Sequence, residues 1–147
     1  MKWICPLFSI VLVAGLVGCG SDGKASVKGK VTYGAKAVKV GEVVIFGGDG
    51  VPQKGRINTD GTYEVKDLVC GECKVAVFSV NPTEALAATR DAKTPPDPQD
   101  IKNWFPIHSS YEDPNTSGQR ITLKAGENEH DIQLKDLSVA ATKGPRR

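Results

Sequence analysis

The chain of 147 residues contains few of the side chains from which catalytic and metal sites are commonly built. It has two histidines, four cysteines and one methionine, and aromatic residues make up 6% of the sequence. The formal net charge is +2, from 19 basic and 17 acidic residues, so the chain lacks the basic excess of a nucleic-acid-binding protein. After residue 18 no apolar run approaches the roughly 18 residues of a membrane-spanning helix. We therefore expect no nucleic-acid partner, no cofactor and no metal.

Turn-forming residues are abundant instead, with 16 glycines and 9 prolines. Between them lie short segments that alternate polar with apolar residues or are continuously apolar, at residues 27–33, 42–46, 54–58, 62–65, 74–80, 120–124 and 129–135. Short strands at this spacing predict an all-β fold, a single β-sandwich of about seven strands. The Asp60-Gly61 turn predicts a hairpin between the third and fourth segments, and residues 125–128 connect the last two.

One connection, residues 81–118, is too long for a structureless loop in a compact domain, so we treat it as an insert. Residues 83–90 predict a short helix, and the Pro-rich residues 94–98 predict an extended surface segment. The aromatic residues of the insert follow at Trp104, Phe105 and Tyr111. Packing on the sandwich is the commoner fate of large aromatics, but these three are also our candidate binding surface for a protein or a carbohydrate.

The N-terminal segment has a pattern of its own, in which Lys2 precedes an apolar stretch over residues 3–17. The LVGC tetrapeptide at residues 16–19 closes this stretch and resembles the lipobox of bacterial lipoproteins. The resemblance implies cleavage between Gly18 and Cys19 and attachment of lipid, such as palmitate, to Cys19. An ordinary signal peptide would need an A-x-A-like site, which is missing before Cys19, and a membrane helix would need a longer run.

On this interpretation the chain has four parts: a lipoprotein signal peptide (1–18), a lipidated tether (19–25), the sandwich (26–135, with the insert at 81–118) and a disordered tail (136–147). The membrane is then a partner through the lipid on Cys19, and the protein belongs to the cell envelope, facing the periplasm or the exterior. Gly20 follows Cys19 where an aspartate would act as an inner-membrane retention signal. The resemblance therefore favours the outer membrane.

Three stretches of the sandwich resemble carboxypeptidase regulatory-like domains. They are the segments VKGKV at 27–31, GEVVIF at 41–46 and TDGTY at 59–63. The later segments YEDPNTSG at 111–118, GEN at 126–128 and DIQL at 131–134 are similar to the end of small bacterial lipoproteins built on this domain. The resemblance implies a Greek-key, transthyretin-like sandwich. It implies no peptidase activity, because in metallocarboxypeptidases this domain accompanies the catalytic domain and carries no chemistry itself.

The cysteines of the mature chain form a C-x-x-C pair. Cys5 would leave with the signal peptide and Cys19 would carry the lipid, so Cys70 and Cys73 are the thiols that remain. In an oxidising compartment we expect them to form a disulfide across a turn. A shared metal, an intermolecular bond and a redox role stay open. In thioredoxin-like oxidoreductases, however, the first cysteine begins a helix that lowers its pKa, whereas strand-forming residues follow Cys73.

Other chemistry has less support in the sequence. His108 and His130 lack the further ligands of a zinc site. An isopeptide bond of the kind found in some pilins could join Lys28 or Lys30 to Asn128. It would need a buried lysine, whereas both lysines lie on the polar face of their strand.

These observations predict a non-enzymatic, lipid-anchored β-sandwich of the cell envelope that serves as a binding, assembly or structural module. The partner would be an envelope protein or a carbohydrate, in addition to the membrane. The alternative function is an envelope thiol-disulfide oxidoreductase that uses Cys70 and Cys73.

Overall fold

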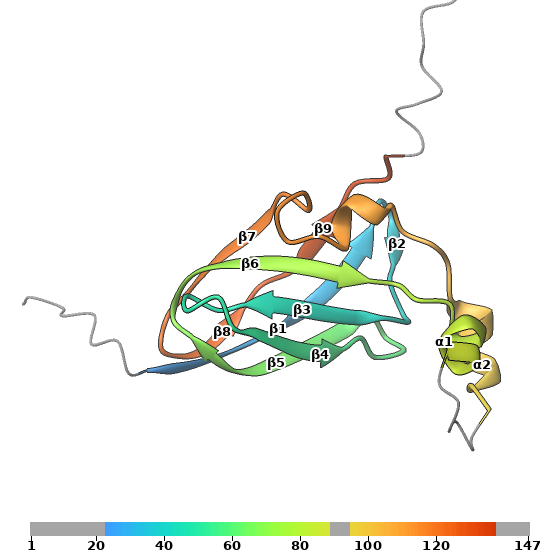
Figure 1. The fold of residues 1–147 in the computed structure, drawn as a ribbon, viewed down its shortest axis with the longest axis horizontal. Coiled ribbons are helices and arrows are strands. Elements are labelled where there is room, and N and C mark those ends of the chain that lie inside the picture. The colour runs from blue at the N-terminus through green and yellow to red at the C-terminus, as the bar shows by residue number, and fades with distance from the viewer. Residues whose placement is uncertain (1–22, 89–94, 138–147) are drawn as a thin grey trace, which may run out of the picture.

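The computed structural model describes residues 23–88 and 95–137, which form two β-sheets packed face to face (Figure 1). In the first sheet β1 (Lys24–Tyr33) pairs antiparallel with β2 (Lys36–Ala37) and β5 (Thr62–Val69), and parallel with β8 (Gly126–Glu129) and β9 (Ile132–Leu134). The second sheet has the antiparallel order β4 (Pro52–Arg56), β3 (Glu42–Phe46), β6 (Gly71–Phe78) and β7 (Gln119–Leu123). The predicted all-β sandwich is confirmed.

The core lies between the sheets and is built from the apolar positions of each strand. In β1 the buried Val27 and Val31 alternate with exposed lysines, as the period-two pattern predicts. In β3 the consecutive residues 43–45 are all buried, which agrees with the continuous apolar run. Strand positions therefore follow from local residue patterns.

The chain changes sheets between β4 and β5. The predicted tight turn is present, because the Asn58 N–H donates to the Thr62 carbonyl at 2.8 Å. However, β4 pairs with β3 and β5 pairs with β1, and one isolated bridge joins Ile57 to Tyr63. The predicted hairpin pairing is therefore wrong. The two strands instead meet at the sandwich edge, where a Cβ on Gly55 would lie 2.2 Å from the Glu64 carbonyl oxygen.

The predicted last strand, residues 129–135, is interrupted at His130 and Asp131. Glu129 ends β8, which also covers residues 126–128 of the predicted connection, and β9 begins at Ile132. β7 stays on β6 in the second sheet, whereas β8 and β9 lie parallel to β1 in the first. The last strands therefore belong to different sheets and do not pair with each other. The break stays bonded to β1, because Asp131 accepts the Lys30 N–H at 2.8 Å and the His130 N–H donates to the Lys28 carbonyl at 2.9 Å.

The insert begins at the end of the sandwich opposite the start of β1 (Figure 1). β5 ends beside the first residue of β1 and β6 starts there, so β6 runs away from that point and α1 (Pro82–Ala88) follows at the far end. This helix agrees with the one predicted at residues 83–90, of which 89 and 90 lie outside the described residues. Among the described helices none is long and apolar enough to cross a membrane.

A second helix, α2 (Pro98–Asn103), begins at the last residue of the predicted extended segment 94–98, whose described residues 95–97 belong to no helix or strand. The Asp97 side chain accepts the Gln99 N–H at 2.8 Å, and Pro98 stands in the first turn of the helix. Both features favour helix starts, since proline lacks only an N–H that has no intrahelical partner there. The short 3-10 helix η1 (Ser109–Tyr111) then leads the chain back toward β7.

Candidate functional site

The N-terminal junction, defined here as Gly23, Lys24, Cys70 and Ala125, is where the described chain enters the sandwich. The Cys70 thiol donates to the Gly23 carbonyl, with an Sγ–O distance of 2.7 Å. Gly23 approaches Ala125 so closely that a Cβ on Gly23 would lie 2.6 Å from the Ala125 Cβ. Lys24 opens β1, and its ammonium contacts the Asp67 carboxylate at 2.8 Å, which holds the pKa of Asp67 below its usual value. The chain is therefore fastened from Gly23 onward.

This junction shortens the predicted tether. Residues 23–25, which we assigned to the tether 19–25, belong to the sandwich, and Ala25 is part of the core. Gly18 and Cys19 lie outside the described residues. Cleavage before Cys19 and its lipidation stay predictions.

The second feature of the junction is the C-x-x-C pair. Cys70 and Cys73 are free thiols, so the predicted disulfide is not formed in this structure. Cys73 lies on β6 and is fully buried in the core, whereas Cys70 precedes that strand, is half-buried and turns its thiol to Gly23. Sequence spacing alone did not reveal that the two side chains have these different environments.

The environment of Cys73 makes this thiol a poor nucleophile. Burial raises the pKa of the Cys73 thiol, and the neighbouring Cys70 and Asp49 raise it further. A raised pKa lowers the fraction of thiolate, the species that attacks disulfides. Moreover, Cys70 leads into strand β6 and not into a helix whose dipole would stabilise a thiolate.

The aromatic residues of the candidate binding surface serve to attach the insert to the sandwich. Tyr111 is only 5% exposed, and its hydroxyl donates to the Lys135 carbonyl at 3.0 Å and accepts the Lys135 N–H at 2.9 Å. Phe105 packs against the core, and the half-buried Trp104 donates its indole N–H to the Ser79 carbonyl at 2.9 Å. The predicted binding surface is therefore wrong for Tyr111, and the packing alternative describes this segment.

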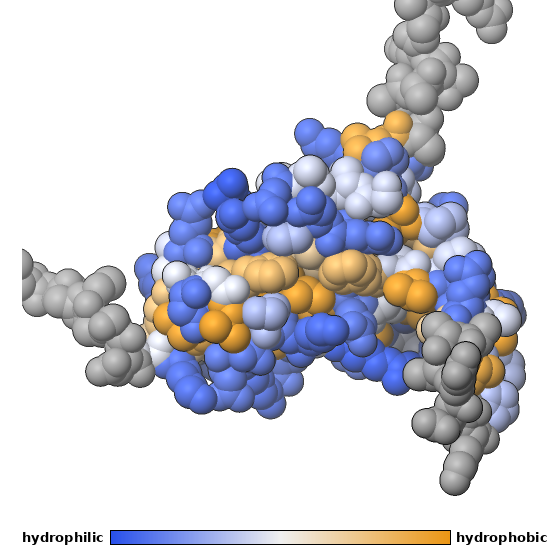
Figure 2. All heavy atoms as spheres, viewed as in Figure 1, coloured by the Kyte–Doolittle hydropathy of each residue, from blue (hydrophilic) through white to orange (hydrophobic). Residues whose placement is uncertain are grey.

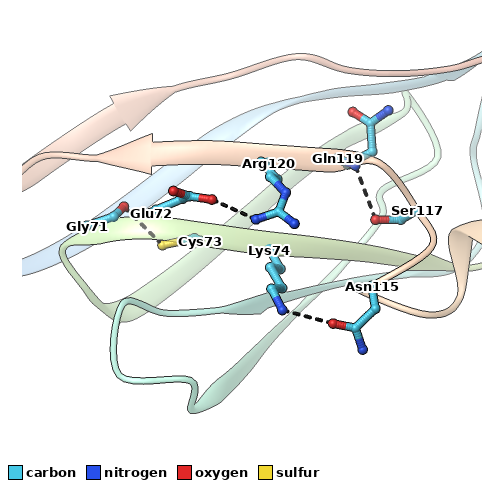
Figure 3. Close-up of polar contacts among 8 residues, drawn as sticks. All are labelled: Gly71, Glu72, Cys73, Lys74, Asn115, Ser117, Gln119 and Arg120. Carbon is cyan, nitrogen blue, oxygen red and sulfur yellow. Dashed lines mark hydrogen bonds and ion pairs between the residues drawn. The ribbon is translucent and has the colours of Figure 1, made fainter.

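The YEDPNTSG segment at residues 111–118 fixes the return of the insert onto β6. Figure 3 shows Lys74 of β6 reaching Asn115, whose side-chain oxygen accepts from the Lys74 ammonium at 2.8 Å. The buried Ser117 donates its hydroxyl to the Val75 carbonyl at 2.6 Å. These bonds satisfy polar groups beside the core, so this motif has a structural role.

The two histidines have different environments. The His108 side chain accepts the Ser110 N–H at 3.2 Å through Nδ1 and so caps η1. His130 stands in the break between β8 and β9, and its carbonyl accepts the Tyr63 hydroxyl at 2.8 Å. Within residues 23–88 and 95–137, no group of three His, Cys, Asp or Glu side chains is placed to hold a metal ion.

The residues of the conceivable isopeptide bond have other contacts. The Asn128 amide donates to the Lys124 carbonyl at 2.8 Å and accepts the Lys124 N–H at 3.0 Å, which closes the turn between β7 and β8. The Lys28 side chain is 56% exposed and lies 3.6 Å from the Glu127 carboxylate. The exposed position and the ion pair of Lys28 do not favour the isopeptide bond, which needs a buried lysine.

Together these contacts define a small two-sheet β-sandwich. The thiols, hydroxyls and imidazoles described above take part in packing, helix capping and turns.

No family model and no curated protein matches the chain. Solved structures similar to it include a DUF3823 family protein from Parabacteroides merdae, with 15% identity and a TM-score of 0.41 over 76% of this chain and 45% of that one. The major pilin subunit BcpA of Bacillus cereus has 10% identity and a TM-score of 0.43 over 78% of this chain and 30% of that one. The minor pilin GBS52 of Streptococcus agalactiae has 14% identity and a TM-score of 0.40 over 86% and 49%.

The chain thus spans less than half the length of each of these three structures.

Proposed function

We propose that this chain is a non-enzymatic, lipid-anchored β-sandwich of the cell envelope, of the carboxypeptidase regulatory-like type, and serves as a binding, assembly or structural module. One observation carries the proposal. The lipobox-like tetrapeptide ends at Cys19, and the chain is fastened to the sandwich at Gly23, four residues later. A lipid on Cys19 would therefore hold a rigid domain through a short link. Gly20 favours the outer membrane as its location.

The side chains of the described sandwich support a structural role. The buried Cys73 thiol, the Tyr111 hydroxyl and the Ser117 hydroxyl lie in or beside the core, and the two hydroxyls are hydrogen-bonded to backbone groups. Groups held in this way contribute to stability and are poorly placed for contact with a substrate. The module would then act through its surface and its anchorage.

Replacing Cys19 with serine tests the anchor. The protein should be expressed in a bacterium with a lipoprotein pathway and grown with a labelled fatty acid. We expect the wild-type chain to incorporate the label and to have the intact mass of a chain that begins at Cys19 and carries acyl groups. Cys19→Ser should lose both the label and the cleavage before residue 19, because serine offers no thiol for the thioether.

Cys70→Ser is the matched control, since it makes the same chemical change in the same chain. It should keep the label and the processed mass. Label that persists in Cys19→Ser, or a wild-type chain that carries no acyl group, would contradict the proposed function.

A further inference from the structure

We infer that one end of the sandwich faces the lipid headgroups and the other end, with α1 and α2, points away from the membrane. The inference rests on the proposed lipid at Cys19. The membrane-facing end, called the proximal end here, consists of the N-terminal junction with the neighbouring turns and strand ends, at residues 23–24, 47–50, 67–72 and 124–127. Its partner is the surface of the bilayer that holds the lipid.

The short link between Cys19 and the sandwich limits where the proximal end can lie. Four Cα steps separate Cys19 from Gly23, so even a fully extended link spans only about 14 Å. The ten residues of β1 alone extend over about 30 Å at the usual rise of a strand. The proximal end therefore stays near the headgroups, whereas the far end can stand well beyond the reach of the link.

Contacts within the proximal end make it a firm attachment point. The Cys70 thiol and Ala125 hold Gly23 from two different turns. The loop at 47–50 joins them, because the Gly48 N–H donates to the Val69 carbonyl at 3.1 Å. Three loops that are distant in sequence thus meet around the first described residue. A pull on the link acts on this whole end of the sandwich and not on a loose strand.

The outer faces of the two sheets give the domain little reason to lie flat on a bilayer. Several of their cations are paired with carboxylates, in the pairs Lys28–Glu127, Lys54–Glu42, Lys66–Glu64 and Arg120–Glu72. Anionic headgroups attract clusters of basic residues, and pairing of this kind weakens such attraction. Figure 3 shows the last of these pairs on the outer side of β6 and β7.

Apolar surface gives no stronger reason for the domain to lie flat on the outer face of the second sheet. Figure 2 shows hydrophobic residues in a narrow band over β3 and β6, bordered by hydrophilic ones. Val44 and Ala76, which pair across these two strands, are 5% and 0% exposed. Because their surface is already shielded, lying flat would bury little more of it. The position of the link then sets the orientation.

Two labelled variants test the inference. Lys124→Cys places a donor fluorophore at the proximal end, and Lys102→Cys on α2 places the same donor at the far end. Both are exposed lysines, and both variants carry Cys70→Ser and Cys73→Ala so that one thiol is labelled. The lipidated chains are reconstituted in phosphatidylcholine vesicles whose headgroups carry an acceptor. Circular dichroism confirms that each labelled chain is folded.

We expect higher energy transfer to the headgroups from position 124 than from position 102. A flexible ten-residue Gly-Ser insertion after Gly20 should lower the transfer from position 124 and reduce the difference. The orientation would be overturned if a chain that sediments with the vesicles shows equal transfer from the two positions, or higher transfer from position 102. The proposed lipid anchor would not be affected by that result. If the wild-type chain, expressed with the lipoprotein pathway, does not sediment with the vesicles, the proposed function is overturned. The orientation, which rests on it, is then overturned as well.

Discussion

Gly29 lies where β1 passes the break between β8 and β9. An alanine at this position tests how closely β1 packs against that break. A Cβ on Gly29 would lie 1.9 Å from the His130 carbonyl oxygen and 3.1 Å from an Asp131 carboxylate oxygen. The nearest atom belongs to the backbone, which cannot rotate away as the end of a long side chain can. Gly29→Ala must therefore push the break away from β1.

The cost of this displacement can be worked out from the contacts that it breaks. Three hydrogen bonds hold the break in place: His130 N–H to Lys28 carbonyl at 2.9 Å, Lys30 N–H to Asp131 carboxylate at 2.8 Å, and Tyr63 hydroxyl to His130 carbonyl at 2.8 Å. Each contributes about 1 kcal/mol net. Overpacking adds roughly 1–3 kcal/mol. Because some of the bonds will re-form after the shift, we expect the free energy of unfolding to fall by about 3–5 kcal/mol.

Urea unfolding of the mature chain, followed by far-UV circular dichroism, measures this change. Gly50→Ala is the matched control, because no atom lies within 4 Å of a Cβ at Gly50. Its φ of +78° still disfavours alanine, so the control should lose about 1–2 kcal/mol through backbone strain alone. A Gly29→Ala variant that is as stable as Gly50→Ala would refute the close contact between β1 and the break.

Three further predictions concern the thiols, the insert and alkaline pH. In the folded protein an alkylating reagent should modify Cys70 before Cys73, because Cys73 is buried and its pKa is raised; equal rates in time-resolved mass spectrometry would contradict this. Tyr111→Phe should lower the free energy of unfolding by about 2 kcal/mol, because two hydrogen bonds to Lys135 are lost, and an unchanged urea midpoint would contradict the role of this hydroxyl. Burial, with a smaller effect of the Asp131 charge, raises the pKa of Tyr63 in the folded protein. The contribution of the protonated Tyr63 to the free energy of unfolding is therefore complete below the unfolded pKa of about 10, and it is lost as the pH rises toward the folded pKa. Tyr63→Phe should therefore show a smaller loss of stability than the wild type between about pH 9 and pH 11 in urea titrations, and an equal loss would count against this cause.

The secondary structure could be predicted as far as it depends on neighbouring residues. The alternation along β1 and the apolar run of β3 identify strands because each residue's face follows from its position in the strand. The α2 helix had a local signal too, in the aspartate and proline at residues 97 and 98, which we assigned to an extended surface segment. The prolines of that segment favour extended backbone, whereas Asp97 followed by Pro98 is also a pattern of helix starts.

The candidate site was predicted less well than the strands. The spacing of Cys70 and Cys73 suggested a disulfide, but spacing does not say that Cys73 enters the core while Cys70 turns toward Gly23. Tyr111 stood in an aromatic cluster, and the sequence did not show that its partner is Lys135. These outcomes depend on contacts between segments that are distant in the sequence.

The residue pattern was therefore enough for the all-β class, for most strand positions and for a lipobox-like segment at residues 16–19, whose lipidation stays a prediction. The folded structure was needed for the separation of β4 from β5, the division of the last strand and the contact between Cys70 and Gly23. The physical reason is the distance along the chain. A strand needs information from a few adjacent residues, whereas Cys70 and Gly23 are 47 residues apart and meet only because the sheets bring the two segments to the same end of the sandwich.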